Sequence, residues 1–198
     1  MKGTKRVVIA YGRFNPPTIG HEKVIKTVMS EAAKFGSADW FIIPSFKHEK
    51  GKNPLDYDYK AHLMEDMFPF ARGHIDLGGC CKDPFYAMSY MSSKGYTDII
   101  FVAGSDRVNA YRKGFAPVEE GGQNGKMGTK TPFTFNSVKV VSAGERDPDN
   151  DNDVSGMSAS KLRQLALEGK TSEFMKGMPN TISASYKVAV MNKILENM

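Results

Sequence analysis

Cysteine is nearly absent from this sequence. Only Cys80 and Cys81 occur, and they are neighbours, so no disulfide can join distant segments of the chain. A small secreted scaffold held together by disulfides is therefore excluded, and we expect reduced thiols in a cytoplasmic protein. A vicinal disulfide or a metal-binding pair is the alternative.

Long hydrophobic runs are missing as well. No apolar stretch approaches the ~20 residues that a membrane-spanning helix requires. The first apolar run, residues 7–11, is too short to form the core of a signal peptide. We therefore expect a protein with no membrane partner.

Neither sign of charge dominates. The 198 residues include 27 Lys and Arg against 22 Asp and Glu, which gives a formal net charge of +5. This surplus suits a phosphate-rich small ligand or a weak nucleic-acid contact. With 40% hydrophobic and 25% charged residues, the composition is that of a globular protein, which excludes disorder of the whole chain and fibrous classes. The length favours one domain over residues 1–198.

Short apolar runs alternate with helical patterns along the chain. Strands are predicted at residues 5–11, 40–43, 74–77, 98–103 and 137–142. Helices are predicted at residues 21–35, 56–68, 84–91, 158–168 and, as a C-terminal helix, 183–198. This order predicts a Rossmann-like, doubly wound parallel sheet flanked by helices. Residues 116–135, rich in Gly and Lys, are predicted to be a surface insertion with nothing to build a core.

The most specific string in the chain is residues 12–21, GRFNPPTIGH, which joins the first predicted strand to the first helix. A glycine loop in this place presents main-chain N–H groups and the positive end of a helix dipole to phosphate. His21, in the first helical turn, can stabilise charge that develops during phosphoryl or nucleotidyl transfer. The alternative is an ordinary turn with a capping threonine and a surface histidine.

A second string, residues 155–163 (SGMSASKLR), precedes and opens a late helix. Ser158 is a good N-cap, and the exposed N–H groups beside Lys161 and Arg163 make an anion site. The alternative is simply a well-capped helix.

Together the two strings resemble the cytidylyltransferase-like nucleotidyltransferase superfamily. Its members carry an HxGH-type signature after the first strand and an ISxTxxR-type signature at a late helix. Residues 18–21 (TIGH) correspond to the HxGH-type signature, with Thr18 in place of the leading histidine. Phosphopantetheine adenylyltransferases of the same superfamily also show this variation. Residues 157–163 correspond to the ISxTxxR-type signature, with serine where threonine is usual.

Further segments within residues 6–168 agree with this resemblance. Residues 52–55 (KNPL) and the Gly-Arg-Phe opening resemble nicotinamide mononucleotide adenylyltransferases of the archaeal type. Residues 104–107 (GSDR) resemble the glycine–acid loop after the fourth strand of the superfamily. The strongest overall resemblance is to nucleotidyltransferase-like proteins of tailed bacteriophages, which would place the protein in the cytoplasm of a host cell.

The resemblance implies binding of a nucleoside triphosphate, with ATP as the first candidate, and Mg²⁺ carried on its phosphates without a protein metal ligand. The acceptor's phosphate attacks the α-phosphorus and pyrophosphate leaves, so no protein nucleophile is needed. The implied catalytic residues are His21, Thr18 and Arg163. The implied nucleotide-binding residues are Gly12, Arg13, Phe14, Asn15, Gly20, Lys52, Gly104, Asp106, Arg107, Ser158 and Ser160, with Lys47 as a weaker candidate.

Other signals are rejected. Neither Gly125-Lys126 nor Gly169-Lys170-Thr171 has the preceding glycine that a Walker-type phosphate loop requires. The acidic run 147–153 lacks the central glycine and the final glutamate of a Ca²⁺-binding loop, so we interpret it as a solvated loop. The alternatives are that it helps to hold Mg²⁺ near the triphosphate or acts as a lid. No DNA- or RNA-binding signature occurs, so we do not expect a nucleic-acid partner.

The first function hypothesis is an adenylyltransferase that acts on a small phosphorylated acceptor, with nicotinamide mononucleotide as the first to try. One rival is a CTP-dependent cytidylyltransferase. A rival from another class is a catalytically inactive nucleotide-binding or virion-associated phage protein. A homo-oligomer is compatible with each of them.

Overall fold

The computed structural model describes residues 3–36, 38–76, 78–144 and 157–198. These residues form two compact units, each assembled from several stretches of chain. The first unit contains Met1–Tyr11, Val24–Ile43 and Cys80–Glu145, and the second contains Gly12–Lys23, Pro44–Gly79 and Arg146–Met198. The single domain expected over residues 1–198 stays a prediction.

A four-stranded sheet organises the first unit. Its strands are β1 (Arg6–Gly12), β2 (Asp39–Pro44), β3 (Asp98–Ala103) and β4 (Ser137–Ser142), in the order β2-β1-β3-β4. The pairs β1–β3 and β3–β4 are parallel, with Ile9 opposite Phe101 and Phe101 opposite Val140. The sheet confirms the predicted Rossmann-like α/β class, because central strands that are apolar along their whole length must be covered on both faces.

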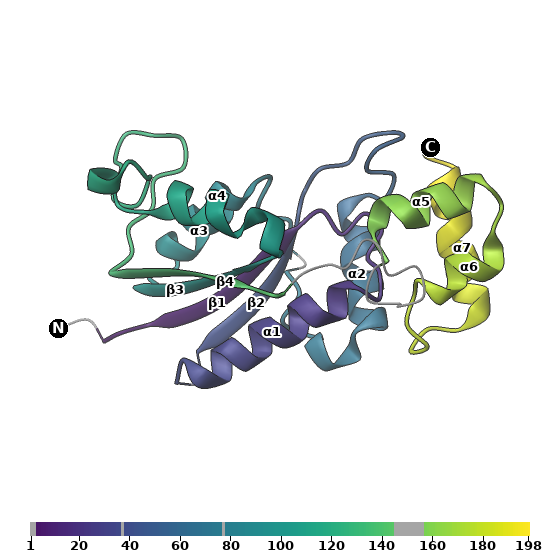
Figure 1. Cartoon of the computed structure of the whole chain (residues 1–198), viewed down its shortest axis with the longest axis horizontal. Helices are drawn as coiled ribbons and strands as arrows, with labels where there is room; N and C mark the ends of the chain where they lie inside the picture. Colours follow the sequence, from purple (N-terminus) through teal and green to yellow (C-terminus); the bar gives the residue numbers. More distant parts are fainter. Residues whose placement is uncertain (1–2, 37, 77, 145–156) are drawn as a thin grey trace. The chain divides into compact units, whose positions relative to one another are not determined.

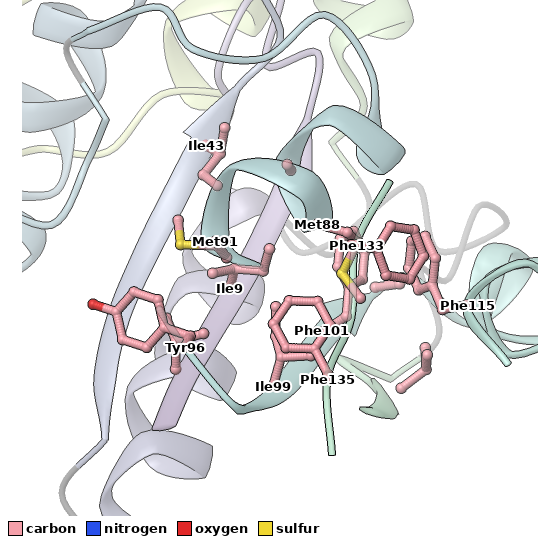
Figure 2. Packing of buried hydrophobic residues seen from close by; sticks show 14 of the residues in the cluster. Ile9, Ile43, Met88, Met91, Tyr96, Ile99, Phe101, Phe115, Phe133 and Phe135 are labelled. Atoms are coloured by element: carbon pink, nitrogen blue, oxygen red, sulfur yellow. The ribbon is translucent and has the colours of Figure 1, made fainter. Parts of the chain in front are cut away.

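Helices cover both faces of this sheet (Figure 1). Helices α3 (Pro84–Ser93) and α4 (Ser105–Phe115) lie on one face and α1 (His21–Lys34) on the other. Ile9 and Phe101 are paired in register, so their side chains point to the same face of the sheet. Both belong to one buried cluster with side chains of α3 and α4, so this is the face that those helices cover. Figure 2 shows the resulting cluster, in which Met88 and Met91 of α3 and Phe115 of α4 pack over the strands.

Helices predominate in the second unit. They are α2 (Tyr57–Met67), the 3-10 turn η1 (Pro69–Ala71), α5 (Ala159–Leu167), α6 (Thr171–Lys176) and α7 (Ala184–Leu195). Helices α5, α6 and α7 pack against one another. Asp56 caps α2 and Ser183 caps α7, each accepting a hydrogen bond from a main-chain N–H of the first turn. None of the helices in the described part of the chain is long and apolar enough to cross a membrane.

Several expectations are wrong. Residues 74–77 form no strand in their described part, where His74 lies in a turn and Ile75 in an isolated bridge. Within the predicted surface insertion 116–135, which includes the 3-10 turn η2 (Val118–Glu120), Phe133 and Phe135 are buried in the cluster of Figure 2. The end of that segment therefore does contribute to the core. Helices α4 and α6 were not predicted.

The two cysteines also depart from expectation. Cys80 and Cys81 are joined in a vicinal disulfide, so the expectation of reduced thiols is wrong and the alternative holds. Cys81 is fully buried within the apolar cluster of the first unit, and Cys80 packs against the same cluster.

Candidate functional site

The structure brings the two sequence strings together within the second unit. Thr18 Oγ1 of the first string donates a hydrogen bond to the carbonyl oxygen of Met157 in the second, at 2.9 Å. Arg163 Nη1 donates to the carbonyl oxygen of Asn15 at 2.6 Å. These bonds join residues 139 and 148 positions apart in the chain. Two segments that the sequence places near opposite ends of the chain thus form one local site.

His21 is held in one orientation at the start of α1. Its side chain is buried, with 6% of its surface exposed, and the ring of Phe14 meets it edge-on at a centroid distance of 4.8 Å. The main-chain N–H of Thr18 donates to His21 Nδ1 at 2.9 Å. Because Nδ1 is an acceptor in that bond, the proton of the neutral ring lies on Nε2. The alternative of a surface histidine is therefore wrong.

The segment around Gly20 is docked on the C-terminal helices. The main-chain N–H of Ile19 donates to the carbonyl of Gly177, which follows α6, at 2.9 Å. A Cβ atom at Gly177 would lie 2.6 Å from Leu162 Cδ2 and 2.8 Å from Met157 Cγ. Only glycine fits without displacement of these side chains, so Gly177 permits the close approach of α5, α6 and the first string.

The two serines of the second string lie where a bound anion can meet their hydroxyl groups. Ser158 caps α5 and accepts from the N–H of Lys161 at 3.0 Å. Ser160, exposed in the first turn, accepts from Arg163 Nη2 at 3.2 Å. Each hydroxyl keeps its own proton as a donor. The helix is thus well capped, as the alternative interpretation expected, and its N-terminus is also a place where phosphate binds favourably.

Two guanidinium groups make this region electropositive. Burial lowers the pKa of Arg163, and the neighbouring positive charge of Arg13 lowers it further. Arg13 itself is exposed. In the described parts of the chain neither group has a carboxylate within ion-pair distance. Two adjacent cations without a carboxylate favour binding of an anion with several charges.

Asn15 serves the architecture of the site. Its side chain is buried, donating from Nδ2 to the carbonyl of Leu55 at 2.8 Å and accepting the N–H of Leu55 at 2.9 Å through Oδ1. The side-chain amide therefore ties the first string to the segment before α2. Lys47 and Lys52 lie in that segment and are exposed.

The remaining nucleotide-binding candidates belong to the first unit. Gly104 directly precedes α4, and Asp106 and Arg107 form the first turn of that helix. The expected glycine–acid loop is thus the beginning of a helix. Arg107 Nε lies 3.4 Å from Asp106 Oδ2, and both side chains are exposed. The acidic run 147–153 lies outside the described residues.

Lys60 and Gly177 were missed by the sequence argument. Lys60 falls on the buried face of α2 with Tyr57, Ala61 and Met64, and it is fully buried. A lysine at a helical spacing otherwise occupied by apolar residues was a readable signal. No such signal distinguishes Gly177, because its requirement comes from the side chains of Leu162 and Met157, which approach it in space.

The fold and the site define a class of protein: a Rossmann-like α/β protein in which the loop after the first strand is hydrogen-bonded to a capped late helix beside two arginines. No family model matches the chain. A protein of Acholeplasma laidlawii named "Probable nicotinate-nucleotide adenylyltransferase" is 28% identical over 107 residues, which are 52% of this chain and 55% of that protein. This match thus spans about half the length of the curated relative.

Solved structures share the fold over nearly the whole chain. Plasmodium falciparum nicotinic acid mononucleotide adenylyltransferase in complex with NaAD superimposes with a TM-score of 0.53 at 14% identity, covering 95% of this chain and 98% of that one. Thermotoga maritima TmcAL bound with alpha-thio ATP gives 0.51 at 13% identity, covering 98% of this chain and 56% of that one. The resemblance predicted from the sequence is confirmed at the level of the fold.

Proposed function

We propose that this protein is an adenylyltransferase, which transfers AMP from ATP to a phosphate-bearing mononucleotide and releases pyrophosphate. One observation carries the proposal: the loop before α1 and the N-terminus of α5 are hydrogen-bonded to each other beside two arginines. The names of the Acholeplasma laidlawii relative and of the Plasmodium falciparum structure support the same reaction.

In this proposal the chemistry needs no protein nucleophile. A phosphate oxygen of the acceptor attacks the α-phosphorus of ATP in line, the bond to the bridging oxygen of the β-phosphate breaks, and pyrophosphate leaves. His21 donates its Nε2 proton in a hydrogen bond to an oxygen of the α-phosphate. Because its orientation is fixed by Thr18 and Phe14, little reorganisation is needed as negative charge develops there.

The β- and γ-phosphates are assigned to the second string. Arg163 and Arg13 neutralise their charge, while the hydroxyls of Ser158 and Ser160 and the N-terminus of α5 donate hydrogen bonds. Thr18 is a lesser donor, because its hydroxyl is already bonded to Met157. Lys52 and Lys47, exposed near α2, are outer cations for the same charge.

Mg²⁺ belongs to this proposal as the cation carried by the triphosphate. The side chains assembled at the site are cations, hydroxyls and one imidazole, which suit phosphate and not a hard metal ion. Among the described residues there is no group of three metal-ligating side chains. No step is therefore assigned to a metal held by this chain.

The acceptor is tested by direct assay of pyrophosphate release. The purified protein is incubated with Mg²⁺ and ATP or CTP, together with nicotinate mononucleotide, nicotinamide mononucleotide or no acceptor. We expect turnover with ATP and one of the two pyridine mononucleotides, with the nicotinate form tried first because the relatives' names point to it. A dinucleotide product identified by mass spectrometry completes the assay.

The other outcomes discriminate between the rivals. Turnover with CTP alone would replace the proposal by the cytidylyltransferase alternative. A rise in melting temperature with ATP, without pyrophosphate from any acceptor, would favour the inactive nucleotide-binding protein. Cytoplasmic location, the link to bacteriophages and homo-oligomer formation stay predictions.

A further inference from the structure

Lys60 is a charged side chain without exposed surface, in the middle of α2. Its Nζ donates to the carbonyl oxygen of Arg13 at 3.0 Å and to that of Ser45. The N–H of Ser45 in turn donates to the carbonyl of Gly12 at 2.7 Å. A buried amine is tolerated only when its donors are satisfied, and here the two acceptors belong to the segments that follow β1 and β2.

A second set of hydrogen bonds holds Asn15, two residues beyond Arg13 in the first string. The carbonyl of Asn15 accepts from Arg163, and its side-chain amide is paired with the main chain of Leu55. The main chain of the first string is thus held at Arg13 by Lys60 and at Asn15 by Arg163. Cations serve as donors at both points, although neither is paired with a carboxylate among the described residues.

The positive charge of Arg13 is repelled by that of Arg163. Burial lowers the pKa of Arg163, and the positive charge of Arg13 lowers it further. Arg163 also binds the carbonyl of Asn15, two residues beyond Arg13. Among the residues that the structure describes, none forms a hydrogen bond or an ion pair with the exposed side chain of Arg13. Its backbone must therefore be fixed by other residues, since a mobile Arg13 would have to be ordered whenever a polyphosphate bound.

We propose that Lys60 is a positioning residue of the polyphosphate site: by binding the carbonyls of Arg13 and Ser45, it fixes Arg13 beside Arg163. This inference rests on the proposed function, and it assigns Lys60 no contact with substrate. The bonds do not depend on the charge of Lys60, because a neutral amine still has two N–H donors for its two acceptors.

The test uses the full-length protein and inorganic pyrophosphate as the probe, with binding measured by calorimetry. Lys60→Met keeps the length and apolar body of the side chain and removes both donors. We expect its affinity for pyrophosphate to fall about tenfold, and the KM for ATP to rise by a similar factor with a smaller change in kcat. Leu63→Ala, a buried position on the same helix, is the control for a general loss of stability.

A double-mutant cycle separates positioning from general damage. If Lys60 acts through Arg13, the effect of Lys60→Met in an Arg13→Ala background shrinks to less than about twofold. If Lys60→Met does not fold, as judged by circular dichroism, Lys60→Leu, which also lacks a donor, takes its place in the same cycle.

Three results would overturn the inference. The first is wild-type pyrophosphate affinity in a folded Lys60 variant. The second is an undiminished effect of the substitution without Arg13, and the third is an equal loss of affinity in Leu63→Ala. A wild-type protein that binds neither pyrophosphate nor ATP would instead remove the proposed function, and the inference with it.

Discussion

Both units bury apolar side chains, but they differ in the polar and charged side chains that they bury. In the described part of the chain, all of the buried polar or charged side chains lie in the second unit, and they are Asn15, Thr18, His21, Ser45, Asn53, Lys60 and Lys187. The cluster at the centre of the first unit consists of aliphatic, aromatic and sulfur-containing side chains. Burial of a polar group is tolerated only when its hydrogen bonds are made, so each of these side chains requires partners at defined positions.

The bonds of the second unit show what that geometry is. Lys60 binds two main-chain carbonyls, and Lys187 binds those of Met175 and Met178 together with the side chain of Asn180. Such bonds fix the path of loops, for which apolar packing offers little directional control. The second unit thus combines an apolar core of its own, which includes Leu63, Phe68 and Phe174, with hydrogen bonds that give the precise placement that catalysis requires.

The largest expected effect tests the first unit. Phe115 is fully buried, with aromatic neighbours such as Phe101 and Phe85 at centroid distances of 5.0 and 5.2 Å. Phe115→Ala should lower the free energy of unfolding by about 3–5 kcal/mol, because it removes packing and leaves a cavity. Urea denaturation measures the change, and Phe46→Ala, at a side chain 58% exposed, is the matched control. Equal losses in both variants would contradict the comparison.

The next effect tests the second unit through activity. His21→Ala should lower turnover by on the order of a hundredfold, since the ring is proposed to stabilise charge on the α-phosphate. Its effect on the free energy of unfolding should be smaller than that of Phe115→Ala. His62→Ala, at an exposed histidine of α2, should retain full turnover in the same pyrophosphate assay. Unchanged turnover in His21→Ala would refute the role assigned to the imidazole.

The two units also differ in how much of them the sequence predicts. Strands β1, β2 and β3 are predictable because each contains an unbroken run of apolar residues that the fold buries, whereas the edge strand β4, in which only Val140 is buried, is predictable from its β-branched residues. Segment 116–135 was misjudged, because two phenylalanines in a glycine-rich stretch carry no periodicity. Their burial depends on long-range packing against the aromatic cluster.

In the second unit the two strings are readable and the bonds between them are not. The glycines, the histidine and the capping serine are residue types with local conformational or chemical reasons, so spacing alone finds them. The acceptors of Thr18 and Arg163 are main-chain carbonyls, which every residue offers. No sequence pattern specifies which carbonyl is used, and the same holds for the acceptors of Lys60.

The smallest expected effect is a pH dependence of the free energy of unfolding, which tests how well the second unit excludes water from Lys60. Burial lowers the pKa of Lys60 to about 8, against the opposing influence of Asp56, from its ordinary value of 10.5. Between these two values the unfolded chain binds a proton that the folded chain does not, so this group makes the free energy of unfolding rise with pH.

Comparison of the wild type with Lys60→Met isolates that contribution. As the pH is raised from about 7 to about 10, the unfolding free energy of the wild type should increase relative to the variant by about 2 kcal/mol. Urea denaturation at a series of pH values measures the difference, with Lys113→Met, at an exposed side chain of α4, as the control. A difference that stays constant over this range would mean that the amine of Lys60 is hydrated in the folded protein. The polar bonds of the second unit would then be less secluded from water than their burial indicates.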